Sequence, residues 1–205
     1  MTELEAKFSL SPQQYTEIKD YFTGKKKYHT FAITELREEV LENSYFDTLD
    51  QHLFKADAAL RIRKSGVHFY LTFKQKEGND KKIQSRKEQE LLLFEEPKLT
   101  DQKLEPCASA RTIVGDLPLQ AIVRIKTKRT IFYFRQNAIV IEMAFDAAQI
   151  THPREEIFFE LELELKKGTR DDLSSFAEQM KTDFALDYSL TTKLNRALGR
   201  EEKVP

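Results

Sequence analysis

The chain has 205 residues, and its 33 Lys and Arg nearly balance its 34 Asp and Glu, which leaves a formal charge of −1. This balance argues against a bulk nucleic-acid binder, whose domain would be strongly basic. Apolar residues make up 40% of the chain, with only 6 Gly and 6 Pro, which excludes disordered and collagen-like classes. One domain over residues 1–205 is expected, because domains usually hold about 100–200 residues.

The sequence carries no sign of membrane insertion or export. No run approaches the roughly 18 apolar residues of a membrane helix. Glu3 and Glu5 lie where a signal peptide would be basic and then apolar. We therefore expect a cytoplasmic protein that binds neither membranes nor nucleic acids. The single Cys107 has no partner for a disulfide and no nearby Cys or His at metal-ligand spacing, which predicts a buried or incidental thiol.

Two segments begin with helix capping signals. Ser11 stands three residues before Gln14 with a proline between them, which predicts a helix over residues 12–23. Thr169 stands three residues before Asp172, and apolar residues then recur at helical spacing. A second helix is therefore predicted there, ahead of the C-terminal segment.

Apart from these helices and a weaker helical periodicity over residues 99–110, the chain alternates between charged and apolar residues with the period of two that is typical of strands. The charged faces of five such stretches carry Glu3, Glu5 and Lys7; Arg61 and Arg63; Thr72 and Lys74; Arg86, Glu88 and Glu90; and Glu160, Glu162 and Glu164. Six or more antiparallel strands with few helices predict a sheet closed on itself, because closure removes exposed edges.

Two interpretations of the charged faces are open at this point. The charged face of an ordinary half-buried sheet would lie in bulk water. Alternatively, the acidic faces and the basic faces point into a shared interior. This alternative is favoured because Glu160, Glu162 and Glu164 would lie about 7 Å apart on one face and repel one another without a cation. In that case the carboxylates would bind a hard divalent metal. Arg61 and Arg63 would bind a polyanion, since guanidinium groups suit bidentate phosphate contacts.

Seven blocks of charged and apolar residues follow one another along the chain. They are Glu3, Glu5 and Lys7; Tyr45–Thr48 with Leu60–Arg63; Thr72 and Lys74; Arg86, Glu88 and Glu90; Arg129 with Glu142 and Asp146; Glu160, Glu162 and Glu164; and Lys193 with Arg196. Taken in this order, the blocks resemble the CYTH, or triphosphate tunnel metalloenzyme, superfamily. A single ExExK motif is weak, but seven blocks in family order over roughly residues 2–198 are specific.

The resemblance implies a mainly β fold, an eight-stranded antiparallel closed barrel with helices packed outside. It also implies a triphosphate bound in the barrel with Mg²⁺ or Mn²⁺, and a homodimer is a possible assembly. The implied metal ligands are Glu3, Glu5, Asp146, Glu160 and Glu162, with Glu164 as an outer or alternative ligand. The implied substrate-binding residues are Lys7, Arg61, Arg63, Lys74, Arg86, Arg129 and Lys193. The implied catalytic residues are Lys7 and Glu88.

The charges agree with this chemistry if the faces point inward. Seven bases could neutralise the roughly four to five negative charges of a triphosphate through charge-assisted hydrogen bonds. The crowded carboxylates would raise one another's pKa unless divalent cations intervened. The sequence leaves open whether Lys126 or Lys128 joins Arg129 inside, because one step of strand register decides it.

Three activities compete within the family: hydrolysis of inorganic triphosphate, hydrolysis of thiamine triphosphate, and cyclisation of ATP by class IV adenylyl cyclases. We favour inorganic triphosphate, because the chain starts directly with ExExK and resembles the triphosphatase branch around YFDT and ELELEL. A binding module for polyphosphate or nucleotides, without turnover, is the alternative from another class. The apparent retention of every essential carboxylate argues against it.

Overall fold

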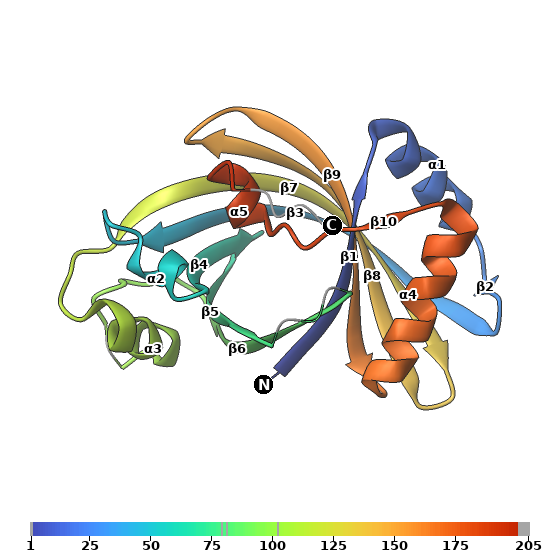
Figure 1. The fold of residues 1–205 in the computed structure, drawn as a ribbon, viewed down its shortest axis with the longest axis horizontal. Helices are drawn as coiled ribbons and strands as arrows, with labels where there is room; N and C mark the ends of the chain where they lie inside the picture. Colours follow the sequence, from blue (N-terminus) through green and yellow to red (C-terminus); the bar gives the residue numbers. More distant parts are fainter. Residues whose placement is uncertain (1, 79, 81, 102, 201–205) are drawn as a thin grey trace.

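The barrel is a ring of eight antiparallel strands. The structure is a computed structural model that describes residues 2–78, 80, 82–101 and 103–200. Neighbouring strands follow the order β1–β6–β5–β4–β3–β7–β8–β9, and β9 pairs back with β1, which closes the ring seen in Figure 1. The strands are β1 (Thr2–Leu10), β3 (Phe31–Asp47), β4 (Ala58–Ser65), β5 (His68–Glu77), β6 (Ile83–Leu93), β7 (Gln120–Gln136), β8 (Ile139–His152) and β9 (Glu156–Lys167). The predicted closed eight-stranded barrel is confirmed.

Within the described residues, five helices and two short strands lie around the ring. They are α1 (Pro12–Phe22), α2 (His52–Lys55), α3 (Glu105–Val114), α4 (Arg170–Phe184) and α5 (Lys193–Ala197), with β2 (Lys27–Tyr28) on β3 and β10 (Asp187–Tyr188) on β1. Both predicted capping boxes are present at α1 and α4. The third helix begins later than the expected residues 99–110, because Pro106 occupies its first turn, where a proline is tolerated.

The apolar faces of the strands point outward and pack under the helices. Figure 1 shows α1 and α4 on one side of the barrel and α3 near its other end. The core beneath α1 and α4 includes Phe8, Phe22, Phe132 and Phe176, all at most 2% exposed. A second core lies between α3 and the outer face of β4 and β5, and it buries Cys107 completely, as expected. A third apolar core, with Val123 and Ile125 on the β7 face that also carries Arg129, packs against Leu194 of α5. The charged faces occupy the rest of the interior.

The strand register shows whether Lys126 or Lys128 of β7 lies inside the barrel with Arg129. Thr127 is 1% exposed, whereas Lys126 and Lys128 are exposed on the outer surface. Lys126 pairs there with Glu42 at 3.6 Å. Neither lysine accompanies Arg129 into the interior, because alternate residues of one strand point to opposite faces. No helix within the described ranges has the length and apolar character needed to cross a membrane.

Candidate functional site

A charged cavity of about 770 Å³ lies inside the barrel. All seven bases expected to bind substrate line this cavity: Lys7, Arg61, Arg63, Lys74, Arg86, Arg129 and Lys193. The carboxylates on its wall include Glu3, Glu5, Glu88, Glu162 and Glu164. Asp146 and Glu160 lie behind this wall and have no exposed surface. The acidic and basic faces of the strands therefore point into a shared interior rather than into bulk water.

Three carboxylates form a buried cluster where β8 and β9 pair. Asp146, Glu160 and Glu162 each offer one oxygen atom, and these atoms all lie within 4.8 Å of one another. The pairing places Asp146 opposite Glu160, and the alternation of β9 returns Glu162 to the same face. No other group of this kind occurs among the described residues. Such oxygen donors are the ligands that hard divalent cations prefer.

Three cations surround this carboxylate cluster. Lys193, at the start of α5, places Nζ 2.9 Å from Asp146, 2.7 Å from Glu160 and 2.7 Å from Glu162. Arg129 donates from Nε and Nη2 to Asp146 at 2.7 and 2.6 Å, and from Nη2 to Glu162 at 2.5 Å. Lys7 lies 3.1 Å from Glu162. The cluster is therefore occupied by cationic side chains contributed by β1, β7 and α5.

These contacts keep Glu162 and Lys193 ionised despite their burial. Burial raises the pKa of Glu162, but Lys193, Lys7 and Arg129 outweigh it and hold that pKa well below its usual value. Burial lowers the pKa of Lys193, but Asp146 and Glu160 outweigh that effect and hold it well above its usual value. Attraction between opposite charges therefore exceeds desolvation on both sides.

The donor set of the carboxylate cluster fits a divalent metal ion. Neither oxygen of Glu160 accepts a hydrogen bond from any described group, although Lys193 Nζ lies 2.7 Å from Oε2. Oε2 is thus in ion-pair contact with Lys193, whereas the buried Oε1 has no partner among the described groups and can coordinate a cation. Mg²⁺ and Mn²⁺ both take carboxylate oxygens as ligands, so the cluster fits either metal.

Other expected metal ligands lie outside this cluster and have different partners. Glu3 pairs with Lys74 at 2.5 Å, and Glu5 pairs with Arg86 at 3.1 Å. Glu164 pairs with Lys166 at 2.7 Å. Burial and the nearby Glu3 raise the pKa of Glu164 to about 7, although Lys166 acts in the opposite direction. The six expected ligands therefore do not form one site: Asp146, Glu160 and Glu162 form the carboxylate cluster, and Glu3, Glu5 and Glu164 lie outside it.

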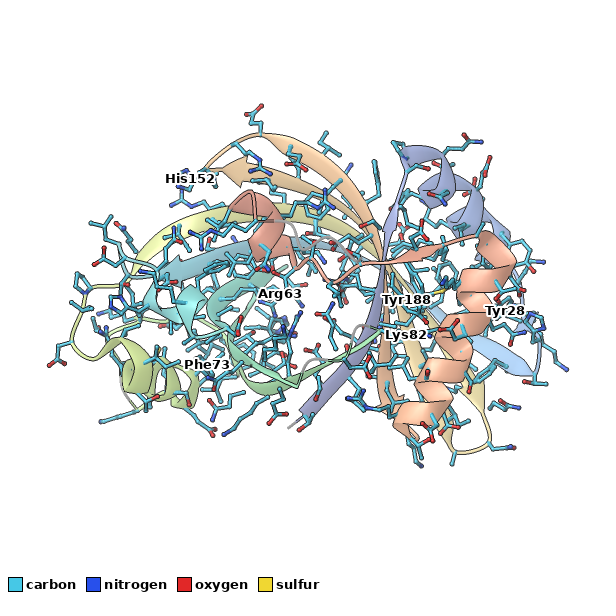
Figure 2. All side chains as sticks on the ribbon, in the orientation of Figure 1. Tyr28, Arg63, Phe73, Lys82, His152 and Tyr188 are labelled. Atoms are coloured by element: carbon cyan, nitrogen blue, oxygen red, sulfur yellow. The ribbon has the colours of Figure 1, made fainter. Side chains whose placement is uncertain are left out.

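The arginines of β4 are less completely paired than the other bases. Arg61 donates to Thr72 at 3.2 Å and lies 3.7 Å from Glu90, but its buried Nε has no partner among the described groups. Arg63 donates from Nε to Asn43 at 3.0 Å. Figure 2 shows Arg63 beside the opening enclosed by the barrel. The β4 side of the cavity therefore carries the positive charge that is least neutralised by neighbouring carboxylates.

Sequence reasoning missed three residues of the site. Lys166 follows Glu164 at the same period of two, so the alternation alone could have placed it inside. Tyr45 lines the cavity. Burial raises the pKa of Tyr45, but Arg61, Lys193 and Arg63 outweigh it and lower that pKa. The third residue, Asn43, had no detectable signal, because one small polar residue in a strand does not reveal its partner.

The fold and the site together define a closed eight-stranded barrel that holds a charged cavity. The chain belongs to the CYTH domain family, which matches residues 1–198. It is 29% identical over 197 residues to an inorganic triphosphatase of Haemophilus influenzae, covering 96% of this chain and 54% of that protein. The chain thus spans about half the length of this relative.

Solved structures share the fold. A putative adenylyl cyclase from Hippeastrum, described as having a dominant triphosphatase activity, superposes with a TM-score of 0.64 at 14% identity and covers 98% of this chain and 97% of that one. A putative adenylate cyclase from Bacillus halodurans superposes with a TM-score of 0.60 at 18% identity, covering 95% and 96% of the two chains. At these identities the likeness shows the fold alone.

Proposed function

We propose that this protein hydrolyses inorganic triphosphate to pyrophosphate and phosphate, and that it requires Mg²⁺ or Mn²⁺. The observation that carries the proposal is the cavity of about 770 Å³ inside the barrel, whose wall carries seven basic side chains and Glu162, with the rest of the carboxylate cluster directly behind it. The relative from Haemophilus influenzae, named an inorganic triphosphatase, supports this choice of substrate. Phosphoryl transfer needs chiefly positioning and charge stabilisation, and this wall can supply both.

In this proposal, the bases divide into two groups. Arg61, Arg63, Lys74 and Arg86 bind the phosphate oxygens, because their strands β4, β5 and β6 form one continuous wall of the cavity. Lys7, Arg129 and Lys193 each contact Glu162 of the carboxylate cluster and would neutralise charge at the reacting phosphate. Charge-assisted hydrogen bonds from both groups would hold the triphosphate in line for attack by water.

The carboxylates have complementary roles in the proposal. Asp146, Glu160 and Glu162 would hold a divalent cation, with Glu3, Glu5 and Glu164 as outer ligands or a second group. When bound, such a cation neutralises carboxylates and withdraws charge from phosphoryl oxygens. Glu88 lies 3.2 Å from Lys74 and offers a carboxylate that can accept a proton from the attacking water. Lys7 would stabilise the charge that develops on the departing pyrophosphate.

The same proposal includes the setting of the reaction. The partner is a small triphosphate rather than a nucleic acid or a membrane, which agrees with the formal charge of −1. The cytoplasmic location and a homodimer stay predictions that fractionation and sedimentation would test.

An organic triphosphate is the second candidate substrate. The volume of about 770 Å³ lies within the range of about 300–1,000 Å³ that is typical of pockets for drug-sized ligands. A nucleoside or thiamine group attached to the triphosphate could use that space. This observation favours class IV adenylyl cyclase and thiamine triphosphatase activities as the alternatives to hydrolysis of inorganic triphosphate.

The test compares three substrates under three metal conditions. Purified protein is incubated with inorganic triphosphate, thiamine triphosphate or ATP, each with Mg²⁺, Mn²⁺ or EDTA, and the products are separated and quantified. The proposal expects fast release of phosphate from inorganic triphosphate with either metal and none in EDTA. Conversion of ATP to cyclic AMP and pyrophosphate would instead establish the cyclase. Inertness towards all three substrates would favour the binding module.

A further inference from the structure

Arg63 differs from the other cavity bases in its partners. Among the residues that the structure describes, each of the other six bases has a carboxylate oxygen within 4.0 Å, and Arg63 has none. Its Nε–H group donates a hydrogen bond to Oδ1 of Asn43 at 3.0 Å. Burial and the like charges of Arg61 and Arg129 lower the pKa of Arg63 to about 10. An anion placed here would relieve this repulsion.

Asn43 is built into the barrel wall directly opposite this arginine. It lies on β3, where the strand register sets it against Arg63 on β4 and Ile125 on β7. It is 3% exposed. Its amide orientation follows from Arg63, because the Nε–H group is a donor and needs an oxygen acceptor. The Nδ2 group donates to the backbone oxygen of Ile125 at 3.5 Å, which is at the long limit for a hydrogen bond.

We propose that Asn43 is a positioning residue for substrate binding, because its uncharged side chain orients the Arg63 guanidinium without neutralising it. The inference rests on the proposed function and adds a residue to it. A carboxylate at this position would orient the arginine equally well, but it would also cancel the charge that attracts a polyanion. An asparagine supplies the acceptor alone, so the terminal nitrogens of Arg63 keep their full attraction for phosphate oxygens.

The experiment uses Asn43→Asp, which preserves the shape and the acceptor while adding one negative charge. Binding of inorganic triphosphate to the full chain is measured by calorimetry in EDTA, and KM and kcat are measured with Mg²⁺. We expect the dissociation constant and KM to rise about tenfold or more, with a smaller change in kcat, because the lost charge attracts substrate before any reaction. The melting temperature of Asn43→Asp checks that the variant folds, because the new carboxylate gains an ion pair with Arg63 but loses the donor to the backbone oxygen of Ile125.

Two further variants keep the test decisive. Asn43→Ala removes the acceptor and should weaken triphosphate binding by several-fold, and it carries the test if Asn43→Asp does not fold. Asn137→Asp adds the same charge at an exposed turn and should bind triphosphate like the wild type. Wild-type binding by folded Asn43→Asp, or by folded Asn43→Ala if the first does not fold, would overturn the inference. Wild-type protein that binds no triphosphate would contradict the proposed function itself.

Discussion

The side-chain nitrogen of Lys193 lies 2.9 Å from Oδ2 of Asp146, although the two residues belong to elements that are not neighbours in the sequence. Asp146 is on β8 and has no exposed surface, and Lys193 begins α5 near the C-terminus of the described chain. The same nitrogen contacts Glu160 and Glu162. A single ammonium group therefore touches every member of the carboxylate cluster, and it lies where a divalent cation would have to compete for the same oxygens.

Replacing Lys193 by methionine should destabilise the protein and make its stability depend on metal. The buried carboxylates would lose a partner, and breaking a buried ion pair typically costs about 3–5 kcal/mol. Urea unfolding in EDTA would measure this loss. Added Mg²⁺ should recover part of it, because a ligand that binds only the folded state stabilises that state.

Lys126→Met is the matched control for this variant. The Lys126 side chain is 60% exposed and pairs with an exposed glutamate on the outer surface. Its loss should change the free energy of unfolding by less than about 0.5 kcal/mol, as expected for a surface pair. Equal destabilisation by both substitutions would argue against a structural role of Lys193 in the carboxylate cluster.

Replacing Glu162 by glutamine should abolish metal-dependent turnover while the barrel survives. The amide keeps the size of the side chain but removes the charge that a cation requires. Removal even of groups that only support a metal ligand typically costs 10–100-fold, so we expect a loss of at least about 100-fold. Initial rates of phosphate release would measure it, with circular dichroism as the check on folding. Glu42→Gln, which changes an exposed carboxylate on the outer face of the barrel, should keep full activity. Full activity of Glu162→Gln would refute the metal assignment.

The sequence predicted the barrel and its inward charges for identifiable physical reasons. Alternation with a period of two reveals strands, and the capping boxes at Ser11 and Thr169 reveal α1 and α4. The helices α2 and α5 were missed, because four or five residues are too few to show helical periodicity. The start of α3 was misplaced, because segment 99–110 offers little apolar periodicity.

The internal pairing of the charges could not be predicted from the sequence. The expected bases do line the cavity, but which carboxylate meets which base depends on register between strands that are distant in sequence. Glu3 meets Lys74 across β6, and Glu5 meets Arg86, so two expected metal ligands have lysine or arginine partners instead. The contact of Asn43 with Arg63 depends on the same kind of pairing. A shift of one residue in the pairing of two strands would change these partners, and a single sequence does not reveal how the strands are aligned.

The N-terminal cap of α4 should contribute measurably to stability. The hydroxyl of Thr169 accepts a hydrogen bond from the Asp172 backbone, and Oδ2 of Asp172 accepts one from the Thr169 backbone N–H at 2.8 Å. Thr169→Ala should lower the free energy of unfolding by about 1 kcal/mol, the typical value for a lost cap. Urea unfolding would measure this change. Thr182→Ala, at an exposed position within the same helix, should cost less, and an equal cost would contradict the capping account.

The stability contributed by Asp80 should vary with pH. Its carboxylate accepts hydrogen bonds from the backbone N–H groups of Lys82 and Ile83, and it also pairs with Arg170. The first two contacts are the main cause of its lowered pKa. Because the folded-state pKa is below the unfolded value, the contribution is present above the unfolded value of about 3.9 and is lost as the pH falls through the folded value.

Asp80→Asn should therefore be less stable than the wild type at pH 7, and the difference should fade below about pH 4. We expect no more than about 0.5 kcal/mol, because 44% of the side chain is exposed and solvent screens its charge. Melting temperatures of both proteins across this pH range would measure the difference. A difference that stays constant with pH would contradict the ionic account.

The most direct test of the central claim follows the phosphorus atoms of inorganic triphosphate by ³¹P nuclear magnetic resonance. The protein is added in the presence of Mg²⁺, and a parallel sample contains EDTA. The account predicts that the triphosphate signals disappear only with Mg²⁺, and that pyrophosphate and phosphate appear in equal amounts. Unchanged triphosphate signals in the Mg²⁺ sample, or equal conversion in EDTA, would contradict it.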